Sequence, residues 1–350
     1  MKKRIALALA LLMLGTSVLA GCKKGGTTSD EEINNTNKPV DLDAPVITVG
    51  APEMETTEYD DIEMISVDGT TYSAAMFRTM LYQVADSVGG TDTQAWITGA
   101  VEALKEWKSL DTLSRSYSVY LEDSDYEEIY NLRTQTIAEY ENPEAYYEEL
   151  DFYHLTDTVY VENIKQNVLF TKFAEAFVAA FVPDEQAMVD YAEEKYIRVK
   201  HILVKTEGLD DSQKAEARSR ADRVLERAKA GESFEALVQE ISEDGMDPEL
   251  GYYFTNNGKM VKAFEDASFA LEVGQISDIV ESQYGYHIIK KYPMEREHIL
   301  ADSTIVNEAA SYLCNEAYEA AVAETVAKAQ VEYLEKFDET VNTLIAEYQA

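Results

Sequence analysis

The chain of 350 residues carries 66 Asp and Glu against 30 Lys and Arg, a formal net charge of −36. Such an acidic chain repels phosphate, which argues against nucleic acid as a partner. The length exceeds what one hydrophobic core usually serves, so we expect two domains. We expect no cofactor and no metal, because the sequence contains no zinc-ligand spacing, no Walker phosphate loop and no dinucleotide-binding fingerprint.

The N-terminus has the pattern of a signal peptide, predicted over residues 1–21. A basic start is followed by an apolar stretch shorter than the roughly 20 residues that a membrane-spanning helix needs. The sequence Leu-Ala-Gly-Cys then ends at Cys22 and resembles a bacterial lipobox, in which the cysteine becomes lipidated. An ordinary secretory signal that happens to end near a cysteine is the alternative. Residues 22–58 are rich in Gly, Thr, Asn, Asp and Pro, which predicts a flexible tether.

Residues 59–196 are predicted to form an N-terminal helical region. It starts with a short strand, a turn at Asp68-Gly69 and a second strand. Ser73 has the residue type of an N-cap for the helix that follows. A Val-Pro-Asp-Glu step opens the last helix, with Pro183 expected in its first turn. Apolar residues at helical spacing predict the helices between them at about 92–113, 123–140, 143–155 and 159–181.

The central segment, residues 197–292, contains two strand-like stretches of alternating polarity. Each has a histidine among aliphatic neighbours, His201 in the first and His287 in the second. The chain has only 4 histidines, so this repetition is informative. Between the two stretches lie two amphipathic helical patterns, a turn with glycine and an apolar run at 260–271.

Residues 293–350 are predicted to be a C-terminal helical segment, because apolar residues recur at three- and four-residue steps from about Asp302 to Tyr348. If Cys22 carries lipid, Cys314 is the only other cysteine and no intrachain disulfide can form. Cys314 is most simply a small buried hydrophobic residue.

The central motifs resemble those of the parvulin-type peptidyl-prolyl cis/trans isomerases, and the resemblance covers residues 197–292. It implies a small antiparallel sheet with surrounding helices that isomerises X-Pro peptide bonds. The split of the helical regions around this domain resembles the PrsA and SurA group of extracytoplasmic foldases. In that group, N- and C-terminal helical segments join into one chaperone domain. The fold class that we expect is therefore α+β, a parvulin domain inserted in an all-α chaperone domain.

The resemblance also implies roles for individual residues. His201 and His287 match a pair of histidines that face each other under the substrate carbonyl. Asp244 falls where the family has an Asp or Cys beside the reacting amide, and Ser282 matches a hydroxyl near the histidines. The proline-binding slot of the family matches Leu250, Met260 and Phe264, with Tyr253 at its rim.

Each of these residues also has a structural interpretation. Histidines in apolar strands are usually core residues with satisfied hydrogen bonds. Met260 and Phe264 have the spacing of an ordinary core stripe, and Asp244 lies in a sequence common in turns and caps. The sequence does not choose between a catalytic and a structural role for Asp244.

The loop at 206–211 is acidic and would repel a phosphate, so we do not expect phosphoserine-proline specificity.

The resemblance implies an extracytoplasmic foldase that lipidated Cys22 holds at the outer face of the cytoplasmic membrane. Its partners would be the lipid bilayer and unfolded or partly folded secreted proteins with X-Pro bonds. A holdase chaperone without significant isomerase activity is the alternative. A third hypothesis is a surface-anchored binding lipoprotein, which only the acidic helical regions suggest. The sequence leaves the oligomeric state, a monomer or a homodimer, open.

Overall fold

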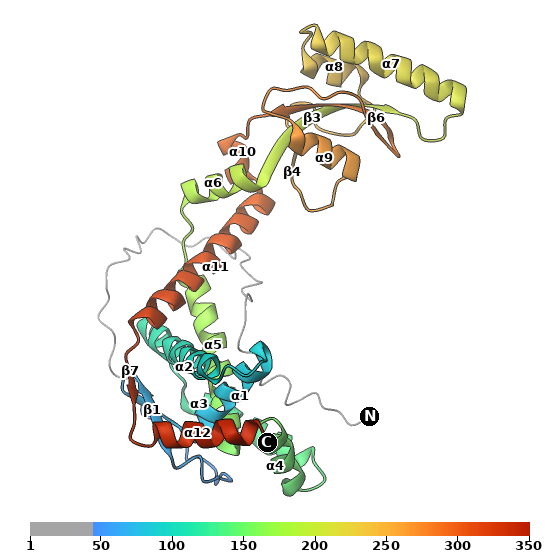
Figure 1. The fold of residues 1–350 in the computed structure, drawn as a ribbon. Coiled ribbons are helices and arrows are strands. Elements are labelled where there is room, and N and C mark those ends of the chain that lie inside the picture. Colours follow the sequence, from blue (N-terminus) through green and yellow to red (C-terminus); the bar gives the residue numbers. More distant parts are fainter. Residues whose placement is uncertain (1–44) are drawn as a thin grey trace. The chain divides into compact units, whose positions relative to one another are not determined.

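The computed structural model describes residues 45–350. The predicted signal peptide, Cys22 and the first part of the predicted tether lie outside this range. The described chain divides into two compact units (Figure 1). Unit 1 comprises the described residues up to Val182 together with Cys314–Ala350, and unit 2 comprises Pro183–Leu313. None of the helices within residues 45–350 combines the length and the apolar character that crossing a membrane requires.

Unit 1 contains a three-stranded antiparallel sheet built from both ends of the described chain. β1 (Glu63–Val67) and β2 (Thr70–Ser73) form the predicted hairpin. Its turn places Asp68 and Gly69 at positive φ, 47° and 77°, as tight hairpins require. β7 (Val331–Tyr333) pairs with the other edge of β1. The sequence predicted helix through this stretch, but pairing with β1 supplies its backbone hydrogen bonds instead.

Helices make up most of unit 1, and side-chain caps set several of their starts. Ser73 accepts a hydrogen bond from the Met76 amide, and Thr156 from that of Val159. Phe77 and Phe337 meet edge-to-face in the core, with ring centroids 5.3 Å apart. Cys314 is fully buried, as predicted. The helices are α1 (Ala74–Val88), α2 (Thr93–Ser116), α3 (Asp123–Ala138), α4 (Pro143–Phe152), α5 (Asp157–Ala180), α12 (Phe337–Tyr348) and the second part of α11 (Ser303–Lys328).

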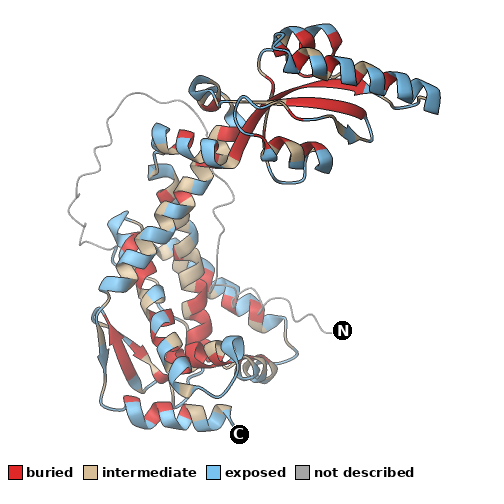
Figure 2. Cartoon of the chain, turned by 45° about the horizontal axis from the view of Figure 1, so that its top comes forward, coloured by how far each residue is buried: buried red, intermediate tan, exposed pale blue. Residues whose placement is uncertain are grey.

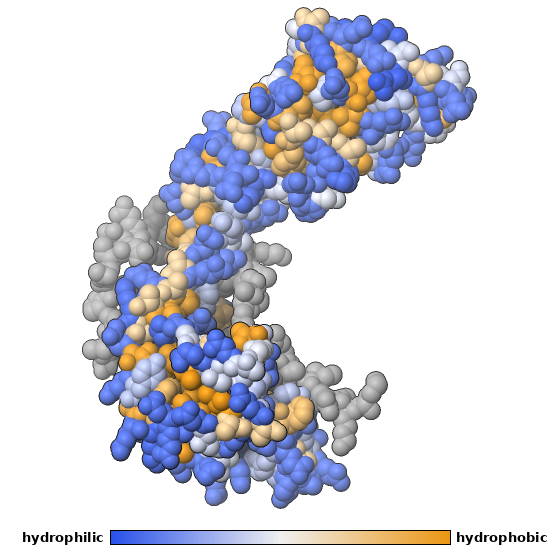
Figure 3. Space-filling model, viewed as in Figure 1, coloured by the Kyte–Doolittle hydropathy of each residue, from blue (hydrophilic) through white to orange (hydrophobic). Residues whose placement is uncertain are grey.

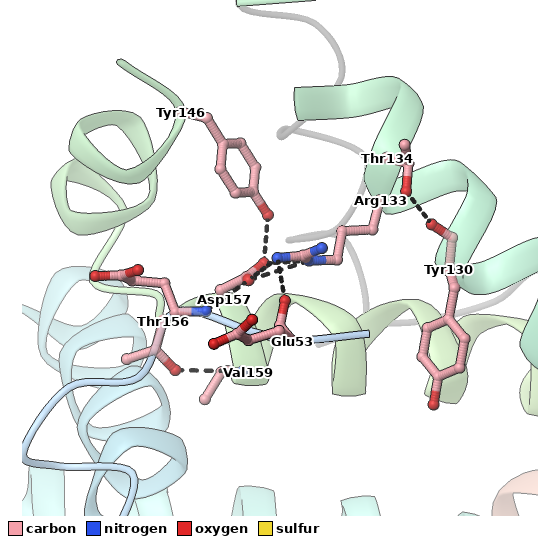
Figure 4. A network of polar contacts seen from close by, with 9 residues as sticks. Glu53, Tyr130, Arg133, Thr134, Tyr146, Thr156, Asp157 and Val159 are labelled. Atoms are coloured by element: carbon pink, nitrogen blue, oxygen red, sulfur yellow. Dashed lines mark hydrogen bonds and ion pairs between the residues drawn. The ribbon is translucent and has the colours of Figure 1, made fainter. Parts of the chain in front are cut away.

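A buried ion pair joins α3 to α5 (Figure 4). Arg133 Nε lies 2.8 and 3.0 Å from the two carboxylate oxygens of Asp157. The Tyr146 hydroxyl donates to the same carboxylate at 2.8 Å. The Asp157 side chain is fully buried, so each of these donors compensates for the water that the carboxylate has lost.

The same ion pair fastens the chain that precedes the first strand. The Glu55 amide donates to Asp157 at 3.2 Å, and Arg133 donates to the Glu53 carbonyl at 3.4 Å. Further back, the Thr48 amide donates to Asp123 at 2.8 Å. The sequence predicted a flexible tether as far as residue 58, which extends it too far. Its polar composition resembles disorder, but side chains of α3 and α5 satisfy its backbone groups.

Unit 2 is built on a four-stranded antiparallel sheet in the order β4-β3-β6-β5. In the central pair, His201 lies opposite Ile289 and Leu203 lies opposite His287. Both central strands are buried along most of their length (Figure 2). The strands are β3 (Tyr196–Lys205), β4 (Tyr252–Thr255), β5 (Val280–Ser282) and β6 (Gly285–Tyr292).

Helices cover both faces of this sheet. Side chains of β3 alternate between the faces, so Val199 packs with α9 (Lys262–Ala270), whereas Ile202 packs with α8 (Phe234–Ile241) and α7 (Asp211–Lys229). The unit also contains α6 (Glu185–Lys195) and α10 (Arg296–Ala301).

The predicted start of α6 needs a small correction. Asp184 is the N-cap and accepts from the Ala187 amide at 2.9 Å. Pro183 therefore lies just before the cap and not in the first turn.

The predicted fold class is confirmed: a small antiparallel sheet with surrounding helices is inserted in a mainly helical unit. That unit is not all-α as expected, because it also contains the β2-β1-β7 sheet. Polar side chains cover much of the face shown in Figure 3, and apolar residues form smaller patches among them.

Candidate active site

Two histidines face each other on the central strands of unit 2. His201 and His287 both lie on the side of the sheet that α9 covers, and they are diagonal neighbours in the β3–β6 ladder. Their Nδ1 atoms are 3.1 Å apart, and the ring planes differ by 17°. The two residues are 3% and 5% exposed. The register of the two strands therefore brings together residues that are far apart in the sequence.

A chain of polar contacts runs through this pair. Asp244 Oδ2 lies 2.9 Å from His201 Nε2, and Ser282 Oγ lies 2.7 Å from His287 Nε2. An ionised Asp244 can only accept, so the proton of His201 lies on Nε2. With both rings neutral, His287 Nδ1 then donates to His201 Nδ1, and the Ser282 hydroxyl donates to His287. The contacts thus select one tautomer for each imidazole.

The electrostatics support this arrangement of protons. The hydrogen bond from His201 holds the pKa of Asp244 well below its usual range, and the Tyr252 hydroxyl adds a second donor at 2.7 Å. Burial raises the pKa of Tyr252, and Asp244 reinforces the shift. Burial also lowers the pKa of His287 to about 4, with charge on His201 acting in the same direction. At neutral pH, Asp244 is therefore an anion and His287 is neutral.

Apolar side chains stand beside the polar chain. The Phe264 ring contacts both imidazoles, with centroids 4.9 Å from His201 and 5.4 Å from His287. Phe264 is 5% exposed, and the half-buried Met260 belongs to the same cluster. The structure thus joins an apolar wall to an ordered row of hydrogen-bonding groups.

Leu250 takes part in a different way. Its backbone carbonyl accepts from Arg198 Nε at 2.9 Å, and its half-buried side chain lies outside the cluster around Phe264. The next residue, Gly251, has φ 79°, and a Cβ there would lie 2.5 Å from the Val199 carbonyl oxygen. Only glycine fits this close approach of the turn to β3.

Tyr253, predicted at the rim of the slot, lies on the opposite face of the sheet. It packs with Tyr196 and Ile299, and its ring lies against that of His298, with centroids 4.1 Å apart and planes tilted by 38°. Its neighbour Tyr252 reaches the site instead and hydrogen-bonds Asp244. Strand residues alternate between faces, so an error of one position reverses the side. The two-residue spacing from Phe254 was the signal that could have identified Tyr252.

Comparison with known proteins identifies the class that this geometry defines. Residues 187–292 match the profile of the family described as PPIC-type PPIASE domain. This segment is therefore a peptidyl-prolyl isomerase domain of the parvulin type.

Along its full length the chain is similar to a foldase protein PrsA. The relative from Caldanaerobacter subterraneus subsp. tengcongensis is 25% identical over 356 residues, which is 99% of this chain and 100% of the relative. Foldase protein PrsA 4 of Bacillus cereus is 36% identical over 148 residues, 39% of this chain and 47% of the relative. Chaperone SurA of Chromohalobacter salexigens is 44% identical over 110 residues, 30% of this chain and 24% of the relative. The chain thus spans about a quarter to a half of these last two curated relatives.

Proposed function

We propose that unit 2 catalyses cis/trans isomerisation of X-Pro peptide bonds in unphosphorylated polypeptides. The uncatalysed reaction is slow because amide resonance sets a barrier of roughly 20 kcal/mol. Rotation breaks no covalent bond, so a catalyst needs only to bind the twisted amide better than either planar form. The contact of Phe264 with the His201–His287 pair carries this proposal, because it sets an apolar surface for the proline ring beside ordered polar groups.

In this proposal Met260 and Phe264 grip the pyrrolidine ring. The imidazoles and Ser282 present fixed dipoles to the substrate carbonyl in a site that excludes much of the water. No proton needs to move, which is consistent with the low pKa of His287, about 4. Asp244 acts by positioning, since its contacts with His201 and Tyr252 hold the chain of hydrogen bonds in one arrangement.

A protease-coupled isomerisation assay of the full chain with an unphosphorylated X-Pro peptide tests this proposal. We expect rate enhancement by the wild-type protein and, in His201→Ala or His287→Ala, a loss of activity larger than the unfolded fraction in thermal melts explains. No enhancement at high protein concentration would favour a holdase that binds clients without catalysis. The relatives named foldase and chaperone, and the separate core of unit 1, are the observations that favour this second candidate.

We further propose that the whole chain assists the folding of secreted proteins outside the cytoplasm, anchored by lipid on Cys22. The Leu-Ala-Gly-Cys motif and the full-length similarity to a foldase protein support this proposal. In it, the helical regions predicted at 59–196 and 293–350 act together as a chaperone domain for unfolded clients, while the segment 197–292 isomerises their X-Pro bonds.

A further inference from the structure

Unit 1 contains a crevice of about 320 Å³ along α2 and α5. A second hollow of about 220 Å³ adjoins it and shares Asp111, Arg115 and Tyr126. Such volumes suit the side chains of a bound segment and not a folded domain. Aromatic rings contribute much of the wall, with Trp107 and Tyr126 both half-buried.

The charge of the crevice differs from that of the chain. In a protein of formal net charge −36, the crevice is lined by Lys108, Arg115 and Lys165 against only Asp111 and Glu162. Lys165 pairs with Glu162 at 2.7 Å. Asp111 is shared, 2.6 Å from Lys108 and 3.0 Å from Arg115. One positive charge is therefore in excess in the crevice, although the chain as a whole is strongly acidic.

Arg115 is the cation with unused capacity. Its side chain is 48% exposed. Nε donates to Asp111, and the guanidinium lies over the Tyr120 ring, 5.9 Å from its centroid. Its remaining guanidinium N–H groups have no hydrogen-bond partner within residues 45–350. The planar fork of arginine fits a carboxylate through two parallel hydrogen bonds.

We propose that this crevice binds an extended segment of unfolded polypeptide in which a carboxylate lies next to an aromatic or large aliphatic side chain. The carboxylate pairs with Arg115, and the apolar side chain packs against Trp107 and Tyr126. The inference rests on the proposed function insofar as the ligand is an unfolded client chain. It adds a binding site for that chain, separate from the residues assigned to isomerisation, and states its chemical preference.

Trp107 provides a direct test. The chain has 2 tryptophans, and the other, Trp96, is 2% exposed. We would titrate the full chain with three short, unstructured, proline-free peptides. One combines Leu and Phe with Glu, one replaces Glu with Lys, and one combines Glu with Gly and Ser. We expect a saturable change in tryptophan emission with the first peptide, weaker binding of the other two, and no signal in Trp107→Phe.

The charge-reversal variant Arg115→Glu should weaken binding of the Leu, Phe and Glu peptide by about tenfold or more and favour the Lys peptide. The control is Lys105→Glu, a reversal on the same helix at a residue that pairs with Glu102 outside the crevice. It should leave binding unchanged. Arg115→Gln provides a milder second variant if thermal melts show that Arg115→Glu unfolds.

The proposal is overturned if the peptides leave Trp107 emission unchanged, if all three bind equally, or if Arg115→Glu and Lys105→Glu behave alike. If Trp107 emission changes with protein concentration and not with added peptide, the crevice binds a second copy of the chain. That result also overturns the proposal. Isomerisation of a short X-Pro peptide is measured on the same variants. Binding without isomerisation contradicts only the isomerase, and isomerisation without binding contradicts only the crevice.

Discussion

At the scale of single residues, the burial of His287 couples stability to pH. Its folded pKa of about 4 lies below the ordinary histidine value of 6.5. As pH falls below 6.5, the unfolded chain takes up a proton that the folded site still refuses. The free energy of unfolding should therefore decrease from pH 6.5 toward pH 4 and lose no more from this residue below that. The total is at most roughly 3 kcal/mol.

Urea unfolding of the wild type and of His287→Gln across this range measures the effect. The difference between the two should grow as pH rises through the window, because the variant lacks the titrating group. Asp244 acts at lower pH, since its depressed pKa keeps its contribution until pH falls below the ordinary value of 3.8. Parallel pH curves for wild type and variant would contradict the account of His287.

Tyr252 should behave as a positioning residue. Tyr252→Phe keeps the ring but removes the hydroxyl that donates to Asp244 at 2.7 Å. A hydrogen bond to a charged group contributes roughly 1.5–3 kcal/mol, so its loss destabilises the ionised form of Asp244. The pKa of Asp244 should therefore rise. We expect kcat/KM to fall and the acid limb of its pH profile to shift upward. Tyr253→Phe, one residue along on the other face, is the matched control and should leave that limb in place.

The slot assignment separates catalysis from stability. Phe264→Ala and Met260→Ala remove apolar volume. Truncation of a buried apolar side chain lowers the free energy of unfolding by roughly 2–5 kcal/mol. If both side chains hold the proline ring, activity should fall further than the unfolded fraction explains. Phe254→Leu, in the same cluster, is the control whose activity should follow folding alone. Isomerisation kinetics and thermal melts on the same samples decide; equal behaviour of the three variants would make Met260 and Phe264 core residues.

At the scale of elements, the Arg133–Asp157 pair holds α3 and α5 together and binds the segment around Glu53 and Glu55, which precedes β1. Asp157→Asn leaves a buried guanidinium without its counter-charge, so we expect a loss of about 3–5 kcal/mol in the free energy of unfolding. Limited proteolysis near Glu53 should become faster, because Asp157 accepts from the Glu55 amide and also positions Arg133, which donates to the Glu53 carbonyl. Asp123→Asn is the control, since Asp123 binds the segment at an exposed place. A similar loss in both variants would show that the buried pair has no special role.

At the scale of the whole molecule, Cys22 should decide where the protein resides. One acyl chain binds membranes marginally, whereas two or more anchor stably, so a diacylglyceryl cysteine should retain the protein at the bilayer. Cys22→Ser should abolish incorporation of labelled lipid and leave the protein released or unprocessed. The acidic chain makes the test clean, because its charge repels anionic lipid. Correctly processed Cys22→Ser protein that stays in the membrane fraction would mean that the lipobox assignment is mistaken.

Local patterns determined much of this protein. Ser73 caps the helix that it was expected to start, and the two histidine strands lie where alternating polarity predicts them. Helical spacing, caps and turns depend on neighbours within a few residues, so a single sequence is enough to predict them. The resemblance of the central motifs to a known family also points to His201 and His287 from the sequence alone.

Tertiary structure decided what depends on residues far apart in the chain. The β3–β6 register brings the two imidazoles to 3.1 Å, and strand phase turns Tyr252, not Tyr253, toward Asp244. Pairing with β1 makes a strand of β7, although its sequence alone favours a helix. Asp157 likewise binds backbone near Glu55 that composition assigned to a tether. Each outcome depends on hydrogen bonds and burial supplied by a distant partner, and local propensity contains no term for that partner.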